Sequence, residues 1–449
     1  MNILIIGGGK LGAELIDCLN KEDHNIALID TNYKTVERFV GKYDILGVHG
    51  NGANIDTLRE AGIEKTDILI AATASDEINV LSALIGNKLG ARHTVVRVRA
   101  PEYSKQLVFM RKELGMSMMI NPDAEAAREI ARTLRSNRNV KMESFSRGRA
   151  ELIELNVTSD FPFANLRLMD LYKIFKFKIL VCAVLRGDDV HIPDGNFKIE
   201  VGDRIYVTAS RTDLNELFQL LGFSKQRVRS AFIIGGGALG YYLAKELTES
   251  EIKVKIVDAS EKRCVELSEL LPEVSIVCGS GNDEALLFEE GIEKYDAVVT
   301  LTGIDEENII LALSAKYMGV PYVIAKVNNM SFIKLTDEKI DTVISPKAIS
   351  ANSIVKYVRS QEENVGEMLT FHKLVDNMVE AVEFVAQEDA KYLNIPLKNM
   401  KLKKGILIAC IVRSGKVIIP GGGDVIEPHD NVIIVSKDRY LRNLEEILA

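Results

Sequence analysis

Two glycine-rich segments with identical spacing hold the residues best suited to bind a charged ligand. Residues 5–12 read IIGGGKLG, and residues 233–240 read IIGGGALG. Glycines in the pattern G-x-G-x-x-G allow a tight turn, let a diphosphate approach the backbone and let a helix pack on the preceding strand. The N-terminus of that helix offers free N–H groups and the positive end of its dipole to phosphates. The pattern predicts binding of a nucleotide diphosphate.

An aspartate follows each glycine loop at the end of the next predicted strand, close to the ~20-residue spacing of a ribose-binding acid. Asp30 closes the run ALID, and Asp258 closes the run KIVD in the second half. A carboxylate there can accept hydrogen bonds from both adenosine ribose hydroxyls. Each half is therefore predicted to bind a dinucleotide or an adenine nucleotide. The alternative is a glycine turn with a purely structural role.

The two predicted sites differ within the glycine loop itself. Lys10 stands between the glycines of the first loop, where its ammonium could meet a terminal phosphate. Ala238 occupies the corresponding position of the second loop. The first site is therefore predicted to be the more cationic of the two.

A later β-rich run adds to this difference. The run HTVVRVRA provides Arg97 and Arg99, whereas the corresponding YVIAKVNN provides Lys326 and Asn328. Arginine can bind a phosphate through two parallel hydrogen bonds, but lysine acts only as a point charge. A more highly charged phosphate is thus expected in the first half. The alternative is that both arginines lie on an edge strand and face solvent or a subunit contact.

A parallel sheet is needed to bring these residues together. Residues 1–137 alternate short β-rich runs with helical stretches, which is the pattern of βαβ units with helices on both faces of the sheet. Thr73 follows the fourth β-rich run and is expected at the carboxyl edge of the sheet, where open α/β sheets bind ligands. The predicted apolar face of the first helix consists of Leu11, Leu15, Ile16 and Leu19.

Each half changes character partway along its length. Residues 141–225 hold alternating β segments, turn signals and a closing helix, which predict a small α+β domain. The second half repeats both patterns. The predicted fold class is α/β, with tandem Rossmann-like, doubly wound parallel-sheet domains that are each followed by a small α+β domain. The expected domains are residues 1–137, 141–225, 228–360 and 366–449.

Further landmarks recur in the same order in both halves. GIEKTD returns as GIEKYD, SDEIN as IDEEN, and HIPDGNFKIEVGDRIYV as VIIPGGGDVIEPHDNVIIV. Solenoid repeats have periods of about 20–50 residues, far shorter than this one. The chain is therefore a duplicated two-domain module.

Composition indicates a globular cytoplasmic protein. Of the 449 residues, 47% are hydrophobic and 27% are charged. No apolar run approaches the ~18 residues that span a bilayer, and the start MNILIIGGGK lacks the basic region and cleavage site of a leader peptide. The five cysteines form no CxxC pair, so neither a disulfide framework nor a zinc site is expected.

Several other kinds of site are disfavoured. The net charge of -8 argues against nucleic acid as a partner. The basic segment 128–149 is more typical of a helix end and linker than of a nucleic-acid patch. DVIEPHD at residues 424–430 fits a turn better than a metal site. The sequence contains no HExxH, nucleophile elbow or GK[ST] loop, so we expect no catalytic residue, no metal and no enzyme activity.

Taken over its whole length, the chain resembles the TrkA family of cytosolic regulatory subunits of Trk-type potassium uptake systems. The resemblance rests on IIGGGKLG with Asp30, VHGNGANIDTLREAGI, ILIAATASDEIN and VVRVRAPEY, and on their second-half counterparts through ISPKAISANSIV. It implies nucleotide-binding RCK (KTN) domains followed by RCK C-terminal domains. By position it implies nucleotide contacts at Gly7, Gly8, Gly9, Lys10, Leu11, Gly12, Asp30, Thr73, Ala74 and Arg97, and at Gly235, Gly236, Gly237, Ala238, Leu239, Gly240, Asp258, Thr302 and Gly303.

The resemblance also implies how the protein works. Chains would form a homo-oligomeric ring, possibly of four copies, on the inner face of the membrane beneath a potassium-translocating subunit. Binding of NAD(H), ATP or ADP would change the ring conformation and gate transport. Two other interpretations stay open at this point: an NAD-dependent oxidoreductase, and a nucleotide sensor for a different transporter.

Overall fold

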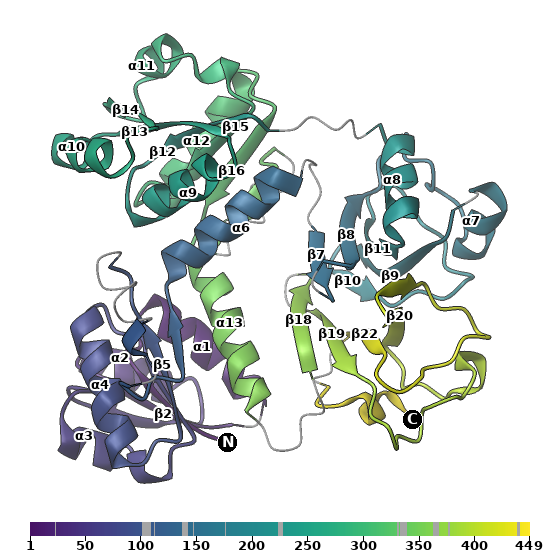
Figure 1. The fold of residues 1–449 in the computed structure, drawn as a ribbon, viewed down its shortest axis with the longest axis horizontal. Coiled ribbons are helices and arrows are strands. Elements are labelled where there is room, and N and C mark those ends of the chain that lie inside the picture. Colours follow the sequence, from purple (N-terminus) through teal and green to yellow (C-terminus); the bar gives the residue numbers. More distant parts are fainter. Residues whose placement is uncertain are drawn as a thin grey trace. The chain divides into compact units, whose positions relative to one another are not determined.

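A computed structural model describes the chain except residues 23, 101–108, 112, 137–141, 147, 176, 223–227, 330–331, 333–338, 362–367, 376–377 and 438–440. The expected boundaries at 137, 141, 225 and 366, and the PEY part of the VVRVRAPEY motif, lie outside the described residues. The chain forms two compact units, and each combines matching parts of both halves. The first unit contains residues 1–137 and 226–358, and the second contains residues 138–225 and 359–449 (Figure 1).

The first unit contains two six-stranded parallel sheets with the same topology. The first sheet has the order β3-β2-β1-β4-β5-β6, in which the chain runs outward from β1 first to one side and then to the other. Its strands are β1 (Asn2–Ile6), β2 (Asn25–Asp30), β3 (Leu46–His49), β4 (Ile68–Ala71), β5 (His93–Arg97) and β6 (Met118–Ile120). Strands β1 and β4 are almost wholly buried, as expected where helices cover both faces.

The second sheet repeats this arrangement in the order β14-β13-β12-β15-β16-β17. Its strands are β12 (Ser230–Ile234), β13 (Lys253–Asp258), β14 (Ser275–Cys278), β15 (Ala297–Thr300), β16 (Tyr322–Lys326) and β17 (Thr342–Ile344). The predicted fold class, tandem doubly wound parallel sheets, is confirmed.

Helices cover both sheets. Those of the first half are α1 (Lys10–Leu19), α2 (Tyr33–Val40), α3 (Ile55–Glu60), α4 (Asp76–Leu89) and α6 (Pro122–Ser136). Those of the second half are α9 (Ala238–Thr248), α10 (Glu261–Leu270), α11 (Glu284–Glu289), α12 (Asp305–Tyr317) and α13 (Pro346–Ser360). The predicted apolar face of α1 is confirmed, since Leu11, Leu15, Ile16 and Leu19 are all buried.

The last helix of each Rossmann-like part packs against the other half (Figure 1). Helix α6 lies along α9, and its residues Ala127, Ile130 and Leu134 share a buried core with Leu243 and Leu247. Helix α13 returns to the first half, where Lys347 Nζ lies 3.2 Å from Glu14 Oε2 of α1. This exchange makes the two Rossmann-like parts one compact unit.

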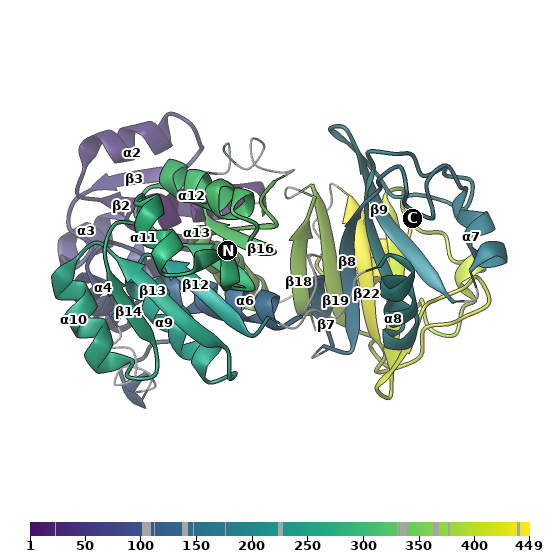
Figure 2. The ribbon, with the colours of Figure 1, turned by 90° about the horizontal axis from the view of Figure 1, so that it is seen from above.

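The second unit consists of two antiparallel sheets, ordered β10-β9-β11-β8-β7 and β18-β19-β22-β20-β21 (Figure 2). Their strands are β7 (Met142–Phe145), β8 (Ala150–Asn156), β9 (Ile179–Arg186), β10 (Asp189–His191), β11 (Arg204–Ala209), β18 (Met368–Leu374), β19 (Val379–Val385), β20 (Ile406–Arg413), β21 (Lys416–Ile418) and β22 (Asn431–Lys437). Helices α7 (Leu168–Ile174) and α8 (Arg211–Leu220) accompany the first sheet. Both sheets share one core, in which Cys182 and Tyr206 pack with Ala381 and Cys410.

The DVIEPHD segment forms a turn held by an arginine. Asp430 is buried and accepts hydrogen bonds from Arg413 Nη2 at 2.7 Å and from the backbone N–H of Glu427 at 2.8 Å. Asp203 and Arg186 form the same pair in the first half, with 2.8 Å between Oδ1 and Nε. Within the described part of the chain, no group of three acidic, histidine or cysteine side chains is placed to hold a metal ion. No helix described there is long and apolar enough to cross a bilayer.

Candidate nucleotide-binding site

The first glycine loop has the geometry that its sequence predicts. Gly7 has a φ of +99°, which disfavours any residue with a side chain. A Cβ on Gly12 would lie 2.0 Å from the carbonyl oxygen of Gly7, so the first turn of α1 can pack on the loop only without a side chain there. Both glycines therefore set the shape of the turn.

Gly9 has a different role from its neighbours. A Cβ placed on this residue would meet no atom within 4 Å, and its φ of −70° suits any residue. Gly9 is the N-cap of α1, and no side chain caps the helix there. The free N–H groups of the first turn therefore face open space, as an anion-binding helix N-terminus requires.

Asp30 holds the loop and keeps capacity for a ligand. Its Oδ2 accepts the backbone N–H of Gly8 at 2.7 Å, and its Oδ1 accepts that of Asn32 at 2.7 Å. A carboxylate has about four lone-pair sites, so two remain for the hydroxyls of a ribose. The same acid thus shapes the loop and faces the cavity beside it.

The carboxyl end of β4 is fixed by a buried asparagine. Asn79 Oδ1 accepts hydrogen bonds from the backbone N–H of Thr73 at 2.8 Å and from its hydroxyl at 2.7 Å. Its Nδ2 donates to the carbonyls of Thr73 at 3.2 Å and of Arg97 at 3.0 Å. One side chain therefore ties the ends of β4 and β5 together beside the glycine loop.

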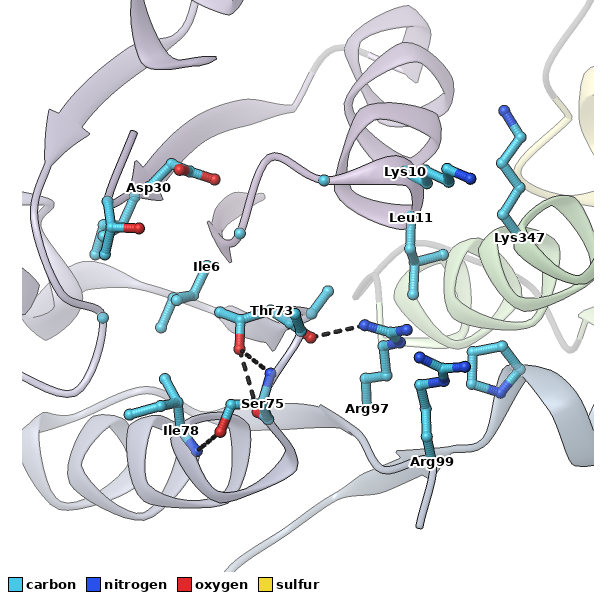
Figure 3. A pocket seen from close by; sticks show the side chains of 18 of the residues that line it. Ile6, Lys10, Leu11, Asp30, Thr73, Ser75, Ile78, Arg97, Arg99 and Lys347 are labelled. Carbon is cyan, nitrogen blue, oxygen red and sulfur yellow. Dashed lines mark hydrogen bonds between the residues drawn. The ribbon is translucent and has the colours of Figure 1, made fainter. Parts of the chain in front are cut away.

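These elements border a cavity of about 720 Å³. Figure 3 shows Asp30 at one side of it and Lys10, Lys347, Arg97 and Arg99 around the other. The first half contributes Ile6, Gly7, Gly9, Lys10, Leu11, Ile29, Asp30, Thr31, Gly50, Asn51, Gly52, Ala72, Thr73, Ala74, Ser75, Ile78, Arg97, Arg99, Pro122 and Asp123. The second half contributes Gly303, Lys326, Asn328, Pro346 and Lys347.

The structure does not place Arg97 and Arg99 on an edge strand, which was the alternative interpretation. Strand β5 lies between β4 and β6, so it is not an edge strand. Arg97 is the last residue of β5, Arg99 follows two residues later, and both line the cavity. Arg97 Nη1 donates to the carbonyl of Thr73 at 2.7 Å, while its buried Nε has no hydrogen-bond partner. Burial and the nearby Arg99 lower the pKa of Arg97.

Most residues predicted for the first half converge on this cavity. Gly7, Gly9, Lys10, Leu11, Asp30, Thr73, Ala74 and Arg97 line it, whereas Gly8 and Gly12 do not appear in its wall. Gly8 faces Thr35 and Phe39 of α2 instead. Gly303, predicted for the second site, lines this first-half cavity.

The second glycine loop repeats the geometry of the first. Gly235 has a φ of +108°, and a Cβ on Gly240 would lie 2.3 Å from its carbonyl oxygen. Asp258 accepts the N–H of Gly236 at 2.7 Å. Asn308 Oδ1 accepts the N–H of Thr302 at 2.7 Å. Leu239 is buried at the start of α9, and Ala238 takes the place of Lys10.

An arginine distinguishes this second loop. Arg263 Nε donates to the carbonyl of Gly236 at 2.7 Å. The corresponding part of the first half has Thr35 beside its loop. The surroundings of the two loops therefore differ on this side as well as at Lys10.

Sequence reasoning missed two contributors to the first site. The first contributor is Asn79. The available signal was that the repeated segments SDEIN and IDEEN carry an asparagine at the same position, Asn79 in the first half and Asn308 in the second. The second contributor is the turn Gly50–Gly52, where a Cβ on Gly52 would lie 2.1 Å from Ile6 Cγ2. Its signal was the pair of glycines in GNGAN.

The fold is that of two Rossmann-type domains in tandem, and the first of them carries a cavity beside its glycine loop. Residues 3–122 and 231–346 match the TrkA-N domain, and residues 152–222 and 381–449 match the TrkA-C domain. The chain therefore belongs to the TrkA family, which is regulatory rather than enzymatic.

Named relatives support this membership. The chain is 32% identical to the "Trk system potassium uptake protein TrkA homolog" of Archaeoglobus fulgidus, with 100% of both chains covered. It is 30% identical to the "Trk system potassium uptake protein TrkA" of Halomonas elongata, with 100% of this chain and 98% of the relative covered. The family resemblance inferred from the sequence is confirmed.

Solved structures share the fold at low sequence identity. The GsuK RCK domain superposes with a TM-score of 0.61 at 17% identity, covering 97% of this chain and 92% of that chain. The GsuK channel bound to NAD superposes with a TM-score of 0.60 at 19% identity, covering 97% of this chain and 77% of that one. Both show that the fold is that of tandem RCK domains.

Proposed function

We propose that this chain is a nucleotide-binding regulatory subunit of a Trk-type potassium transporter. The observation that carries the proposal is the first-half cavity, which joins a glycine loop, an open helix N-terminus, the carboxylate of Asp30 and a cationic end. Each part suits one group of an adenine nucleotide: the loop a diphosphate, Asp30 a ribose, and the cations a further phosphate.

The ligand is proposed to be NAD(H), ATP or ADP. The open space at Gly9 and the unpartnered Nε of Arg97 leave room and a donor for phosphate groups. The structurally similar GsuK channel has been solved bound to NAD and, in another structure, bound to ADP. The nineteen residues predicted from the sequence are the proposed contacts, with Asn79 and Asn308 as positioning residues.

The regulated partner is proposed to be a membrane-embedded potassium-translocating subunit. The relatives at 30–32% identity are named for Trk potassium uptake, and the chain would act at the inner face of the membrane. Assembly of several copies into a ring would let their conformational changes act together on one potassium-translocating partner. A binding protein shifts a transporter between states only by its ligand's differential affinity for them, and 1–3 kcal/mol changes an equilibrium by roughly 5- to 150-fold.

Calorimetric titration of the purified chain with ATP, ADP, NAD and NADH tests the proposal. Asp30→Ala is expected to weaken binding at one site by about tenfold or more, because the ribose loses charge-assisted hydrogen bonds. Asp258→Ala should act on a separate site. Nucleotide-dependent potassium flux through the reconstituted transporter should fall in the same variants. No binding by the unaltered chain, or turnover of NADH with a carbonyl substrate, would contradict the regulatory role.

A further inference from the structure

A pair of cysteine thiols lies beside Asp258, the acid that follows the second glycine loop. Cys264 belongs to α10, and its Sγ lies within hydrogen-bond distance of the carbonyl oxygens of Asp258, at 3.3 Å, and of Val277, at 3.8 Å. Cys278 ends β14, follows Val277 in the chain and is the parallel-strand partner of Asp258. The Cys264 thiol therefore lies against two residues that flank Cys278, one along the chain and one across the sheet.

The two thiols interact with each other but differ in their access to solvent. Cys264 is buried, whereas Cys278 is exposed. Burial and a hydrogen bond with the Cys278 side chain raise the pKa of Cys264 to about 11, so Cys264 is protonated at neutral pH. Cys278 is therefore the thiol that a reagent in solution meets first, and Cys264 is the neighbour that can react with it next. An accessible cysteine beside a second thiol is the arrangement found in redox-sensing sites.

Another pair of cysteines provides a contrast within the same chain. Cys182 and Cys410 pack in the shared core of the second unit, where they are 0% and 1% exposed. Burial raises the pKa of Cys182, and it raises that of Cys410 to about 12. The thiolate is the reactive form of cysteine, so both are poor nucleophiles as well as inaccessible. This pair should not react with an oxidant in solution while the unit is folded.

We propose that Cys264 and Cys278 form a reversible disulfide with hydrogen peroxide as the oxidant, and that this disulfide weakens nucleotide binding at the second glycine loop. The second part rests on the proposed function of that loop. The Cys278 thiolate attacks the peroxide, the O–O bond breaks, and the hydroxide that leaves takes up the proton that Cys278 had lost. The Cys264 sulfur then displaces the hydroxyl of the sulfenic acid on Cys278, which leaves with the Cys264 proton as water. Two thiols thus lose two electrons, and one peroxide becomes two water molecules.

A disulfide at this position would change the surroundings of Asp258. The carbonyl of Asp258 accepts the N–H of Gly279 at 2.9 Å and also faces the Cys264 thiol. In the first half the carbonyl of Asp30 accepts the N–H of Gly50 at 3.0 Å, and Gly50 lines the nucleotide cavity. Hydrogen-bonded sulfurs lie farther apart than the ~2.05 Å of an S–S bond. Oxidation therefore draws α10 and the end of β14 together and removes the thiol donor next to the acid.

Peptide mapping after mild peroxide treatment tests for the disulfide. The purified chain is treated with hydrogen peroxide, its remaining thiols are alkylated, and the peptides of a digest are identified by mass. We expect the major product to be a Cys264–Cys278 disulfide that dithiothreitol reverses, with Cys182 and Cys410 still reduced. Cys278→Ser, which alters an exposed residue, should prevent it. Oxidation of Cys278 without a bond to Cys264, or no reaction of either thiol, would overturn the proposal.

Calorimetry on the reduced and oxidised chains measures the effect on nucleotide binding. In the Asp30→Ala background, which leaves the second site to be measured, oxidation is expected to lower the affinity for ADP and NADH by about three- to tenfold, because contacts around Asp258 are lost. Cys278→Ser should make this affinity insensitive to peroxide. The first site, measured in the Asp258→Ala background, should not respond to peroxide.

The two measurements separate this inference from the proposed function. Unchanged affinity at the second site despite a mapped disulfide overturns the effect on binding. An equal loss at both sites would assign it to general oxidative damage and also overturns that effect. If the reduced chain binds no nucleotide at all, the proposed function is contradicted, and the effect on binding with it. The disulfide itself is decided by the peptide map alone.

Discussion

Gly9→Asp is expected to abolish nucleotide binding in the first half without destabilising the protein. A side chain fits at Gly9, because a Cβ there meets no atom within 4 Å and φ is −70°. Aspartate is also a favoured N-cap, and α1 has no side-chain cap. The new carboxylate would, however, stand where phosphates approach the helix. Two like charges about 4 Å apart repel by about 4 kcal/mol near a protein surface, so affinity should fall by about 100- to 1,000-fold.

Gly9→Ala is the matched control for this prediction. It adds a Cβ without charge into the same open space, so it should reduce affinity far less than aspartate. Calorimetry measures the affinities, and thermal unfolding checks that neither variant lowers stability. Equal losses in both variants would mean that steric crowding, and not charge, governs this position. Gly237→Asp carries the same test to the second loop, where a Cβ also meets nothing within 4 Å.

The glycine loops could be predicted because their requirements are local. Gly7 needs a positive φ, and Gly12 cannot carry a side chain because its Cα lies against the carbonyl of Gly7. Both requirements involve residues within a few positions of each other in the sequence. Asp30 follows at a spacing fixed by the length of one helix and one strand. Alternation of strands and helices likewise fixes a parallel sheet. These features depend on short stretches of chain.

The two-sided cavity could not be predicted because it depends on which sheet each helix covers. The apolar spacing of Ala127, Ile130 and Leu134 indicates an amphipathic helix, but the same pattern would suit either sheet. Only the folded chain shows that α6 joins the core of α9 and that α13 returns to the first half. The sequence comparison of Arg97 with Lys326 treated them as parts of separate sites, yet both line one cavity.

Burial of charge in the second unit was also beyond sequence reasoning. Arg359 is only 1% exposed, and its Cζ lies 4.2 Å from the ring centroid of Phe371. Glu380 of β19 accepts hydrogen bonds from Nη2 at 2.8 Å and from Nη1 at 3.3 Å. Nothing in a basic residue near the end of a predicted helix distinguishes a buried arginine from an exposed one.

Glu380→Ala is accordingly expected to destabilise the second unit by about 1.5–3 kcal/mol, because it removes two charge-assisted hydrogen bonds from the buried Arg359 guanidinium. Unfolding of a chain with several domains is not two-state, so native-state hydrogen exchange of the β19 amides is the suitable measurement. Protection there should fall by about tenfold or more. Asp170→Ala, which breaks an exposed pair with Lys173 in α7, should change protection in the sheet that α7 accompanies by less than tenfold.

The double variant Arg359→Met with Glu380→Ala tests whether the loss reflects the buried positive charge of Arg359. Methionine keeps apolar contact with Phe371 and removes the cation, so most of the lost protection should return if the cost comes from the buried positive charge. Protection that stays as low as in Glu380→Ala would instead assign the loss to packing around β19. The Arg359–Glu380 pair would then stabilise the unit through packing, and removing either side chain should lower the protection of the β19 amides by the same factor. Arg359→Met alone measures that directly, because it leaves Glu380, whose side chain is 15% exposed, with access to water.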